Sequence, residues 1–261
     1  LDGTFYRLRG LAREPRPARR PADDLRLAEL DTDAFLAEHY HAPRYARVLA
    51  LLADYLPADA PALLDVGRSR LTEMIADAFS IPVDSLGFPP DQETPTGRHF
   101  RFDLNDAQHE ARWRRDLPAY DVVLLAEVIE HLHTAPTLVL GFLKTLLKPG
   151  GVLIIQTPNA AALHKRLALL AGRNPYQRIK EDATDPGHFR EYTLRELKDY
   201  AAHAGLTVEA SFYGNYFDYR YRAHATEKDV PPRRVLGLLN LGYRLLPGPL
   251  KPGITLVLRR P

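Results

Sequence analysis

Short runs of apolar residues alternate along the chain with segments in which apolar residues recur at helical spacing. The runs predict strands near residues 62–67, 83–87, 99–104, 119–128, 152–159, 206–214 and 253–260. The periodic segments predict helices over residues 33–56, 71–79, 129–147, 193–205 and 233–246. Because strands and helices alternate in this way, we expect an α/β fold with a doubly wound, mostly parallel sheet and helices on both faces.

The beginning of the chain has a different texture. Residues 1–33 are rich in Arg, Pro and Asp (EPRPARRPADD), which predicts a flexible lead-in arm. Acidic residues dilute its positive charge, which favours a solvated tail over an arm that binds an acidic partner. Residues 34–261 contain no internal repeat, and we interpret them as a single domain.

Composition narrows the functional classes. Lys and Arg number 35 against 33 Asp and Glu, a formal net charge of +2, which argues against a nucleic-acid coat. The absence of Cys excludes a thiolate zinc site and a Cys nucleophile. No apolar stretch is long enough for a membrane span and no signal peptide is evident, so we expect a cytoplasmic protein without membrane attachment.

In a doubly wound sheet, ligands bind outside the carboxyl ends of the strands. The first strand ends in ALLDVG, where Gly67 permits a tight turn and Asp65 can orient the loop or hold a cationic group. An ordinary strand-to-helix turn with a capping Asp explains the same residues, so this motif by itself leaves both interpretations open.

The order of the motifs is more informative. LLDVG, FDL, DVVLLAEVIEHL and LKPGG precede a late pair of strands, and this order resembles the class I S-adenosylmethionine-dependent methyltransferases over roughly Tyr45 to Arg260. AEVIEHL, LKPGGVLIIQTPN and GHFREYTLREL look most like the ubiquinone-pathway, sugar and small-RNA O-methyltransferases. The resemblance implies a Rossmann-like methyltransferase fold with seven strands and S-adenosylmethionine as cofactor.

The resemblance also implies roles for individual residues. Asp65 and Gly67 would hold the methionine end of the cofactor, with Ser69 in the same loop. Asp103 and Leu104 would lie beside the adenine, and Glu127 would close the site at the end of the central strand.

Two features depart from the family pattern. The loop after the first strand usually contains three glycines, but Ser69 and Leu71 replace two of them and Arg68 and Arg70 are expected to crowd the loop. The second strand normally ends in an acid that accepts both ribose hydroxyls. Phe88 aligns there, and Asp84 or Asp91 would replace the acid only after a local shift.

An acidic and histidine cluster follows the central strand. Glu127, Glu130 and His131 would share one side of a helix that begins there, and His188 would approach from a later loop. These four residues form a candidate site for Mg²⁺ or Mn²⁺, and the small-RNA 2′-O-methyltransferases resemble this pattern. Without a metal, His131 or His188 is a candidate general base. A purely structural role stays open.

Three further segments have alternative interpretations. For Arg44 we prefer the interpretation of an exposed surface residue. The alternative is an ion pair between its guanidinium and the carboxylate of the cofactor. The tyrosines of residues 213–222 would stack on an acceptor or pack against the C-terminal helix. Leucines of that helix are expected in the core rather than at a dimer interface, and they are Leu236, Leu238, Leu239 and Leu245.

We therefore expect methyl transfer from S-adenosylmethionine to the hydroxyl of a small sugar, polyol or phenol. The alternative is a degenerate relative that keeps the fold as a binding or scaffolding module. RNA 2′-O-methylation is a third option that the near-neutral charge disfavours. The sequence identifies neither the acceptor nor the oligomeric state.

Overall fold

The computed structural model describes residues 32–182, 186–221 and 233–261. Its centre is an eight-stranded sheet with the order β3-β4-β2-β1-β5-β6-β8-β7. The strands are β1 (Leu63–Val66), β2 (Asp84–Gly87), β3 (Gln92–Glu93), β4 (Arg98–Arg101), β5 (Tyr120–Ala126), β6 (Leu147–Pro158), β7 (Thr207–Gly214) and β8 (Gly253–Arg259). β4, β2, β1, β5 and β6 run parallel, and β8 inserts antiparallel between β6 and β7. The doubly wound α/β architecture is confirmed.

The sheet has eight strands where seven were expected. The additional strand, β3, contains two residues and pairs antiparallel with β4 at the sheet edge. Its residues, Gln92 and Glu93, are both exposed and polar. An edge strand without an apolar residue leaves no hydrophobic signal in the sequence.

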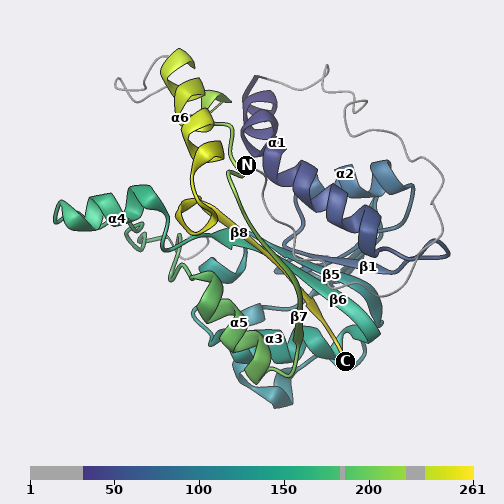
Figure 1. Cartoon of the computed structure of the whole chain (residues 1–261). Coiled ribbons are helices and arrows are strands. Elements are labelled where there is room, and N and C mark those ends of the chain that lie inside the picture. Colours follow the sequence, from purple (N-terminus) through teal and green to yellow (C-terminus); the bar gives the residue numbers. More distant parts are fainter. Residues whose placement is uncertain (1–31, 183–185, 222–232) are drawn as a thin grey trace.

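Helices cover both faces of the sheet (Figure 1). α1 (Thr32–Tyr55) and α2 (Arg70–Phe79) lie on one face, α3 (Pro136–Thr145) and α5 (Leu194–His203) lie on the other, and α4 (Leu163–Leu170) and α6 (Arg233–Leu245) project beyond the sheet. α1 begins two residues inside the expected arm, whose residues 1–31 lie outside the described part of the chain. α4 was not predicted.

The helix expected over residues 129–147 is interrupted. Ile129–His131 form a 3₁₀ turn, and α3 begins only at Pro136. Ala135 adopts φ −57° and ψ 129°, because the ring of a following proline disfavours the helical conformation. The prediction of one continuous helix was therefore wrong.

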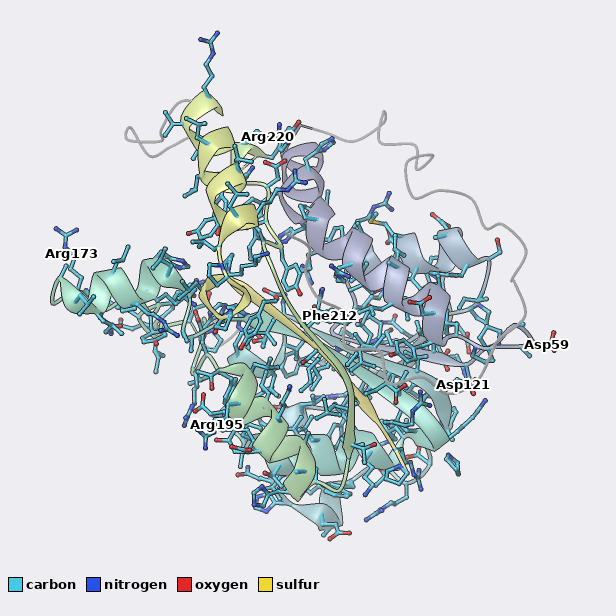
Figure 2. The ribbon with its side chains drawn as sticks, in the orientation of Figure 1. Asp59, Asp121, Arg173, Arg195, Phe212 and Arg220 are labelled. Carbon is cyan, nitrogen blue, oxygen red and sulfur yellow. The ribbon has the colours of Figure 1, made fainter. Side chains whose placement is uncertain are left out.

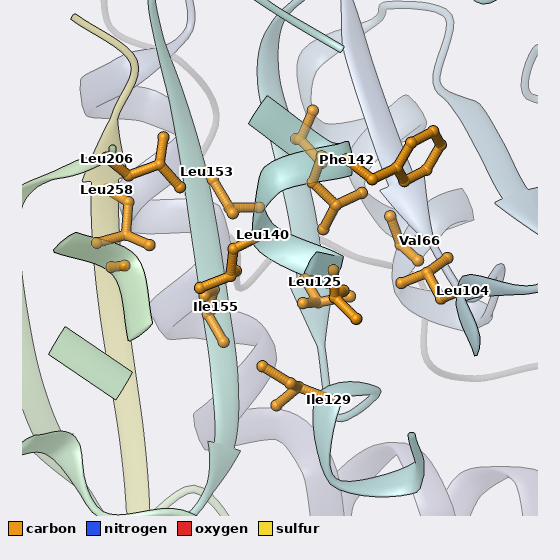
Figure 3. Packing of buried hydrophobic residues seen from close by; sticks show 14 of the residues in the cluster. Val66, Leu104, Leu125, Ile129, Leu140, Phe142, Leu153, Ile155, Leu206 and Leu258 are labelled. Atoms are coloured by element: carbon orange, nitrogen blue, oxygen red, sulfur yellow. The ribbon is translucent and has the colours of Figure 1, made fainter. Parts of the chain in front are cut away.

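Two apolar layers hold the helices against the sheet. α1 and α2 bury Leu52 and Ile75 against Val122 and Ile154. On the other face, α3 packs Leu140 and Phe142 among side chains of the sheet (Figure 3). The strand ends are consequently fixed on both sides, which gives the loops that follow them a rigid base.

The leucines of α6 do not join this core as expected. Leu236 is buried, but Leu238, Leu239 and Leu245 are 68%, 41% and 78% exposed. α6 packs mainly on the 3₁₀ turn Tyr219–Tyr221 instead of on the sheet, so only one side of the helix is covered. In the described residues, no helix has the length and apolar character that crossing a bilayer requires.

Candidate active site

The turn after β1 is built around a glycine. Gly67 has φ +82°, and a Cβ at this position would lie 3.0 Å from the Cγ2 of Val128. Its amide donates to the carbonyl of Leu86, which ties the turn to the end of β2. Only glycine fits this left-handed turn without strain, and the turn leaves backbone exposed at the carboxyl edge of the sheet.

The substituted glycine positions are accommodated locally. Ser69 has extended backbone angles, φ −148° and ψ −177°, and its hydroxyl caps α2 by accepting from the amide of Leu71. Leu71 is buried in the core. Arg68 and Arg70 are exposed, and Arg70 pairs with Glu73 at 2.6 Å. The arginines do not crowd the loop as expected, because both side chains are exposed, Arg70 as the first residue of α2 and Arg68 in the turn before it.

Asp65 and Arg44 are two buried residues of opposite charge that interact in the candidate site. Asp65 is buried and accepts a 2.6 Å hydrogen bond from the Thr72 hydroxyl. Burial raises the pKa of Asp65 to about 7, although Thr72 and the charge of Arg44 act in the opposite direction. Arg44 is only 6% exposed and its Nε has no partner among the described residues. The preferred interpretation of Arg44 as a surface residue was therefore wrong.

A cavity of about 410 Å³ opens at the ends of β2 and β4. Phe88, Arg101, Phe102, Asp103, Asp106 and Arg112 line it. Asp103 caps the following 3₁₀ helix by accepting from the amide of Asn105 at 2.9 Å. The side chain of Leu104 is buried in the core, and Leu104 is not among the residues that line the cavity.

This cavity lacks the ribose-binding carboxylate of the family pattern at the end of β2. Phe88 occupies that position and is 69% exposed. Asp84 accepts from the Tyr120 hydroxyl at the start of β2, and Asp91 pairs with Arg114. Neither aspartate therefore replaces the missing acid.

Glu127 directly follows β5 and has an unusual backbone. Its φ of +57° is left-handed, which is uncommon for a residue with a side chain and recurs at active sites. Its amide still donates to the carbonyl of Gln156 at 2.8 Å. Burial raises the pKa of the Glu127 carboxyl, while the charges of Arg44 and Lys165 lower it.

Glu130 is fully buried beyond this turn. Thr157 donates to its Oε2 at 2.9 Å, whereas Oε1 has no partner among the described residues. Burial and the nearby charge of Glu127 both raise the pKa of Glu130. A buried carboxylate oxygen without a donor suits a bound cation or a ligand proton.

The loop around His188 is tied to the same turn. The amides of Phe189 and Arg190 donate to the carbonyl of Glu130 at 2.8 and 3.2 Å. Nδ1 of His131 donates to the carbonyl of Gly187 at 3.0 Å, and the rings of His131 and His188 meet edge to face at 4.7 Å. The sequence prediction that these two histidines converge holds in the structure.

The resulting metal-ligand geometry differs from the prediction in one residue. Ligand atoms of Glu130, His131 and His188 lie within 4.8 Å of one another, and Glu127 is outside this group. A helical turn from Glu127 would have placed Glu127, Glu130 and His131 on one side, but the left-handed residue and the 3₁₀ turn replace that helix. One carboxylate and two imidazoles are a suitable donor set for a divalent ion.

Two residues of the site were not predicted. Glu191 contacts Nδ1 of His188 at 3.3 Å and also pairs with Lys165 of α4, and both side chains are less than 10% exposed. Burial lowers the pKa of Lys165 to about 8, and Glu127 and Glu130 oppose this effect. Glu191 was visible as the residue three positions after His188, but nothing in the sequence indicated that α4 would reach it.

The geometry defines a class of protein. A doubly wound sheet presents a glycine turn, a buried aspartate and a polar cavity at neighbouring strand ends, the place where nucleotide-like ligands bind. Arg44 and Asp65 provide opposite charges for the two ends of an amino acid, so the residues fit S-adenosylmethionine, apart from its ribose.

Residues 37–211 match the family model of the methyltransferase domain. The chain belongs to this family and is an S-adenosylmethionine-dependent methyltransferase of class I. A search of curated proteins found no matching sequence.

Solved structures show the same fold at low sequence identity. A chain in the complex between the Haloferax volcanii Trm112 methyltransferase activator and a putative methyltransferase is 16% identical, with a TM-score of 0.55 over 88% of this chain and 92% of that one. A methyltransferase from Archaeoglobus fulgidus is 16% identical, with a TM-score of 0.50 over 87% and 99% of the chains. The geranyl diphosphate C-methyltransferase of Streptomyces coelicolor, solved with Mg²⁺, is 11% identical, with a TM-score of 0.52 over 93% and 91%.

Proposed function

We propose that the protein transfers the methyl group of S-adenosylmethionine to a hydroxyl oxygen of a small sugar, polyol or phenol. The observation that carries this proposal is the cluster of Glu130, His131 and His188 beside Glu127. A carboxylate and two imidazoles can bind a hydroxyl and withdraw its proton, which an oxygen nucleophile needs at neutral pH.

The cofactor supplies an electrophilic methyl group on a sulfonium. Arg44 would pair with its carboxylate, and Asp65 and Glu127 would accept its ammonium group. The turn at Gly67 would let the backbone approach closely, and Asp103 would face the adenine side. These contacts hold the donor so that the reaction depends chiefly on the position of the two reactants.

The three-residue cluster would act on the acceptor. Glu191 orients His188 through Nδ1, and the Gly187 carbonyl orients His131 in the same way. This pattern is typical of histidines that bind a metal or accept a proton through the other nitrogen. Glu130, His131 and His188 would hold Mg²⁺ or Mn²⁺ with positions left for acceptor oxygens, and the ion would make hydroxyl deprotonation easier. In its absence His131 or His188 is the base.

Aromatic residues of α1, of residues 213–222 and of α6 are candidates for contacting the acceptor. Tyr40 of α1 stacks on Phe217 with ring centroids 4.8 Å apart, and Tyr219 contacts Tyr243 of α6 at 5.6 Å. The tyrosines therefore pack against neighbouring helices, one of the two interpretations drawn from the sequence. We expect these aromatic rings to contact a ring-shaped acceptor whose hydroxyl points at the cluster.

The first test is calorimetric titration with S-adenosylmethionine, followed by incubation with a catechol, a monophenol and a sugar, with and without Mn²⁺. Formation of a methyl ether, identified by mass spectrometry and NMR, is the expected result. Glu130→Gln should retain cofactor affinity and lose about 10²-fold or more of the transfer rate. The exposed Glu110→Gln is the matched control and should leave the rate unchanged.

A second candidate is a binding or scaffolding protein without turnover, which the missing ribose carboxylate at Phe88 favours. Absence of both cofactor binding and methyl transfer would support that candidate and refute the enzyme. A product methylated on carbon or nitrogen would keep the methyltransferase and refute the oxygen acceptor. Methylation of an RNA 3′ end would favour the third candidate.

A further inference from the structure

Two projecting helices carry an exposed apolar surface. On α6, Leu236 and Tyr243 face the protein, while the leucines on the other side are exposed. α4 meets α6 at its first turn, where the Tyr243 hydroxyl lies 3.2 Å from Nδ1 of His164, and α4 carries exposed leucines of its own. We call the following residues the α4–α6 surface: Leu167, Leu169, Leu170, Val235, Leu238, Leu239, Leu241 and Leu245. They are between 41% and 85% exposed, and Leu170 is the most exposed.

The charged residues within the two segments that carry this surface are of one sign. Segments 163–180 and 233–251 contain nine basic residues and no acidic residue, whereas the whole chain is almost neutral. The nine are Lys165, Arg166, Arg173, Arg178, Lys180, Arg233, Arg234, Arg244 and Lys251. Arg173 lies at the outer end of α4, while Asp59 and Asp121 lie at the opposite end of the molecule (Figure 2). The exposed apolar residues therefore lie on two segments that contain basic but no acidic residues.

We propose that the α4–α6 surface docks the protein on an anionic lipid bilayer, with its leucines in the interface and its arginines at the headgroups. Amphipathic helices with leucines on one face and basic residues beside them bind membranes in this way without crossing them. The anionic surface would supply negative charge opposite the exposed arginines of the two helices, among them Arg166, Arg234 and Arg244. Such peripheral binding goes beyond the expectation drawn from the sequence, which was a protein without membrane attachment, and it requires no membrane-spanning helix.

Shape and charge distinguish this occupant from others. The apolar residues stand on helices that project from the body (Figure 1), and a fluid bilayer adapts to such a projection, whereas a protein partner needs a matching groove. A second copy of the chain would present the same cationic segments, so that like charges would face each other. Large exposed apolar patches on soluble proteins mark interaction sites, so a covered state is expected.

Docking would also place the bilayer near the candidate active site. Lys165 lies on the same helix as Leu167 and Leu170, and its ion pair with Glu191 connects α4 to His188. The docking itself does not depend on the reaction, since it is measured without cofactor or acceptor.

The test is flotation of the full chain with vesicles of phosphatidylcholine, alone or mixed with phosphatidylglycerol. The protein should float with the anionic vesicles, and added salt should weaken the association because it screens the arginines. Leu238→Glu combined with Leu245→Glu should reduce partitioning by at least about tenfold, since two apolar side chains leave the interface. Arg234→Gln combined with Arg244→Gln should weaken anionic binding by about tenfold or more.

Leu138→Glu on α3 is the matched control, because this leucine is also exposed but lies on another face of the protein. Its partitioning should equal that of the unmodified chain. Circular dichroism and calorimetric cofactor titration establish that each variant is folded. Equal recovery with and without anionic vesicles would overturn the proposal. So would wild-type binding by the double Glu variant, or a dimer by sedimentation that the same variant dissociates.

Discussion

Replacement of Phe88 by Glu is expected to tighten S-adenosylmethionine binding. The position directly follows β2, lines the 410 Å³ cavity and carries no charge, although related enzymes are expected to have an acid there. Because Phe88 is 69% exposed, its removal takes little apolar contact from the core. The exchange therefore changes the cavity rim and leaves the fold intact.

The size of the effect follows from the hydrogen bonds gained. A carboxylate that accepts from both ribose hydroxyls contributes about 1.5–3 kcal/mol when the bonds are charged. The rim is open to solvent, so we take the lower end of this range. A gain of about 1.4 kcal/mol corresponds to a tenfold lower Kd.

Isothermal titration calorimetry of the wild type, Phe88→Glu and Phe88→Gln measures this gain. Gln has the size of Glu without its charge, and it should recover only a small part of the affinity. Thermal melting establishes that the three proteins are equally folded. If Phe88→Glu binds the cofactor no more tightly than Phe88→Gln, the reasoning about the ribose site is refuted.

Three further predictions concern pH, the orientation of His188 and the core. The pKa of Asp65 is about 7 in the folded protein, against 3.8 for an unperturbed aspartate, so the free energy of unfolding should fall as pH rises between these values. Asp65→Asn should remove part of this pH dependence. In urea unfolding of the cofactor-free protein, the variant should be more stable than the wild type by a few kcal/mol at pH 8, since each pKa unit corresponds to about 1.4 kcal/mol. At pH 4 the two proteins should have nearly the same stability. A variant with the unchanged pH slope would contradict this account. Glu191→Gln should lower the affinity for Mn²⁺ by about tenfold, because the Glu191 carboxylate orients His188, while the affinity for the cofactor stays constant. Equal Mn²⁺ affinities of the variant and the wild type would argue against that role. Phe142→Ala removes a fully buried ring that stacks on Phe102, with ring centroids 4.3 Å apart. The free energy of unfolding, measured in urea, should fall by about 3–5 kcal/mol. A loss below about 1 kcal/mol would instead show that the core closes around the cavity that the ring leaves.

Buried strands were the most predictable part of the fold. Runs such as residues 119–128 and 152–159 are apolar because both faces of a parallel strand are covered, and β5 and β6 lie where these runs indicated. The helix over residues 129–147 failed at Ala135, since hydrophobic spacing continues through a break that Pro136 imposes. α4 was missed because its leucines do not pack in a core and leave a less regular pattern.

The sequence by itself determined the class of the protein, because the order of motifs such as LLDVG and AEVIEHL resembles that of the methyltransferases. These motifs lie at the ends of strands, where this fold binds its ligands. The sequence also determined that His131 and His188 were candidates. Only the tertiary structure decided which groups meet. The left-handed backbone at Glu127 places this residue outside the cluster of Glu130, His131 and His188. The carbonyl of Glu130 accepts hydrogen bonds from the loop that follows His188 and so holds that loop in place. Burial of Arg44 and the pairing of Lys165 with Glu191 likewise depend on contacts between distant segments, which local sequence patterns do not encode.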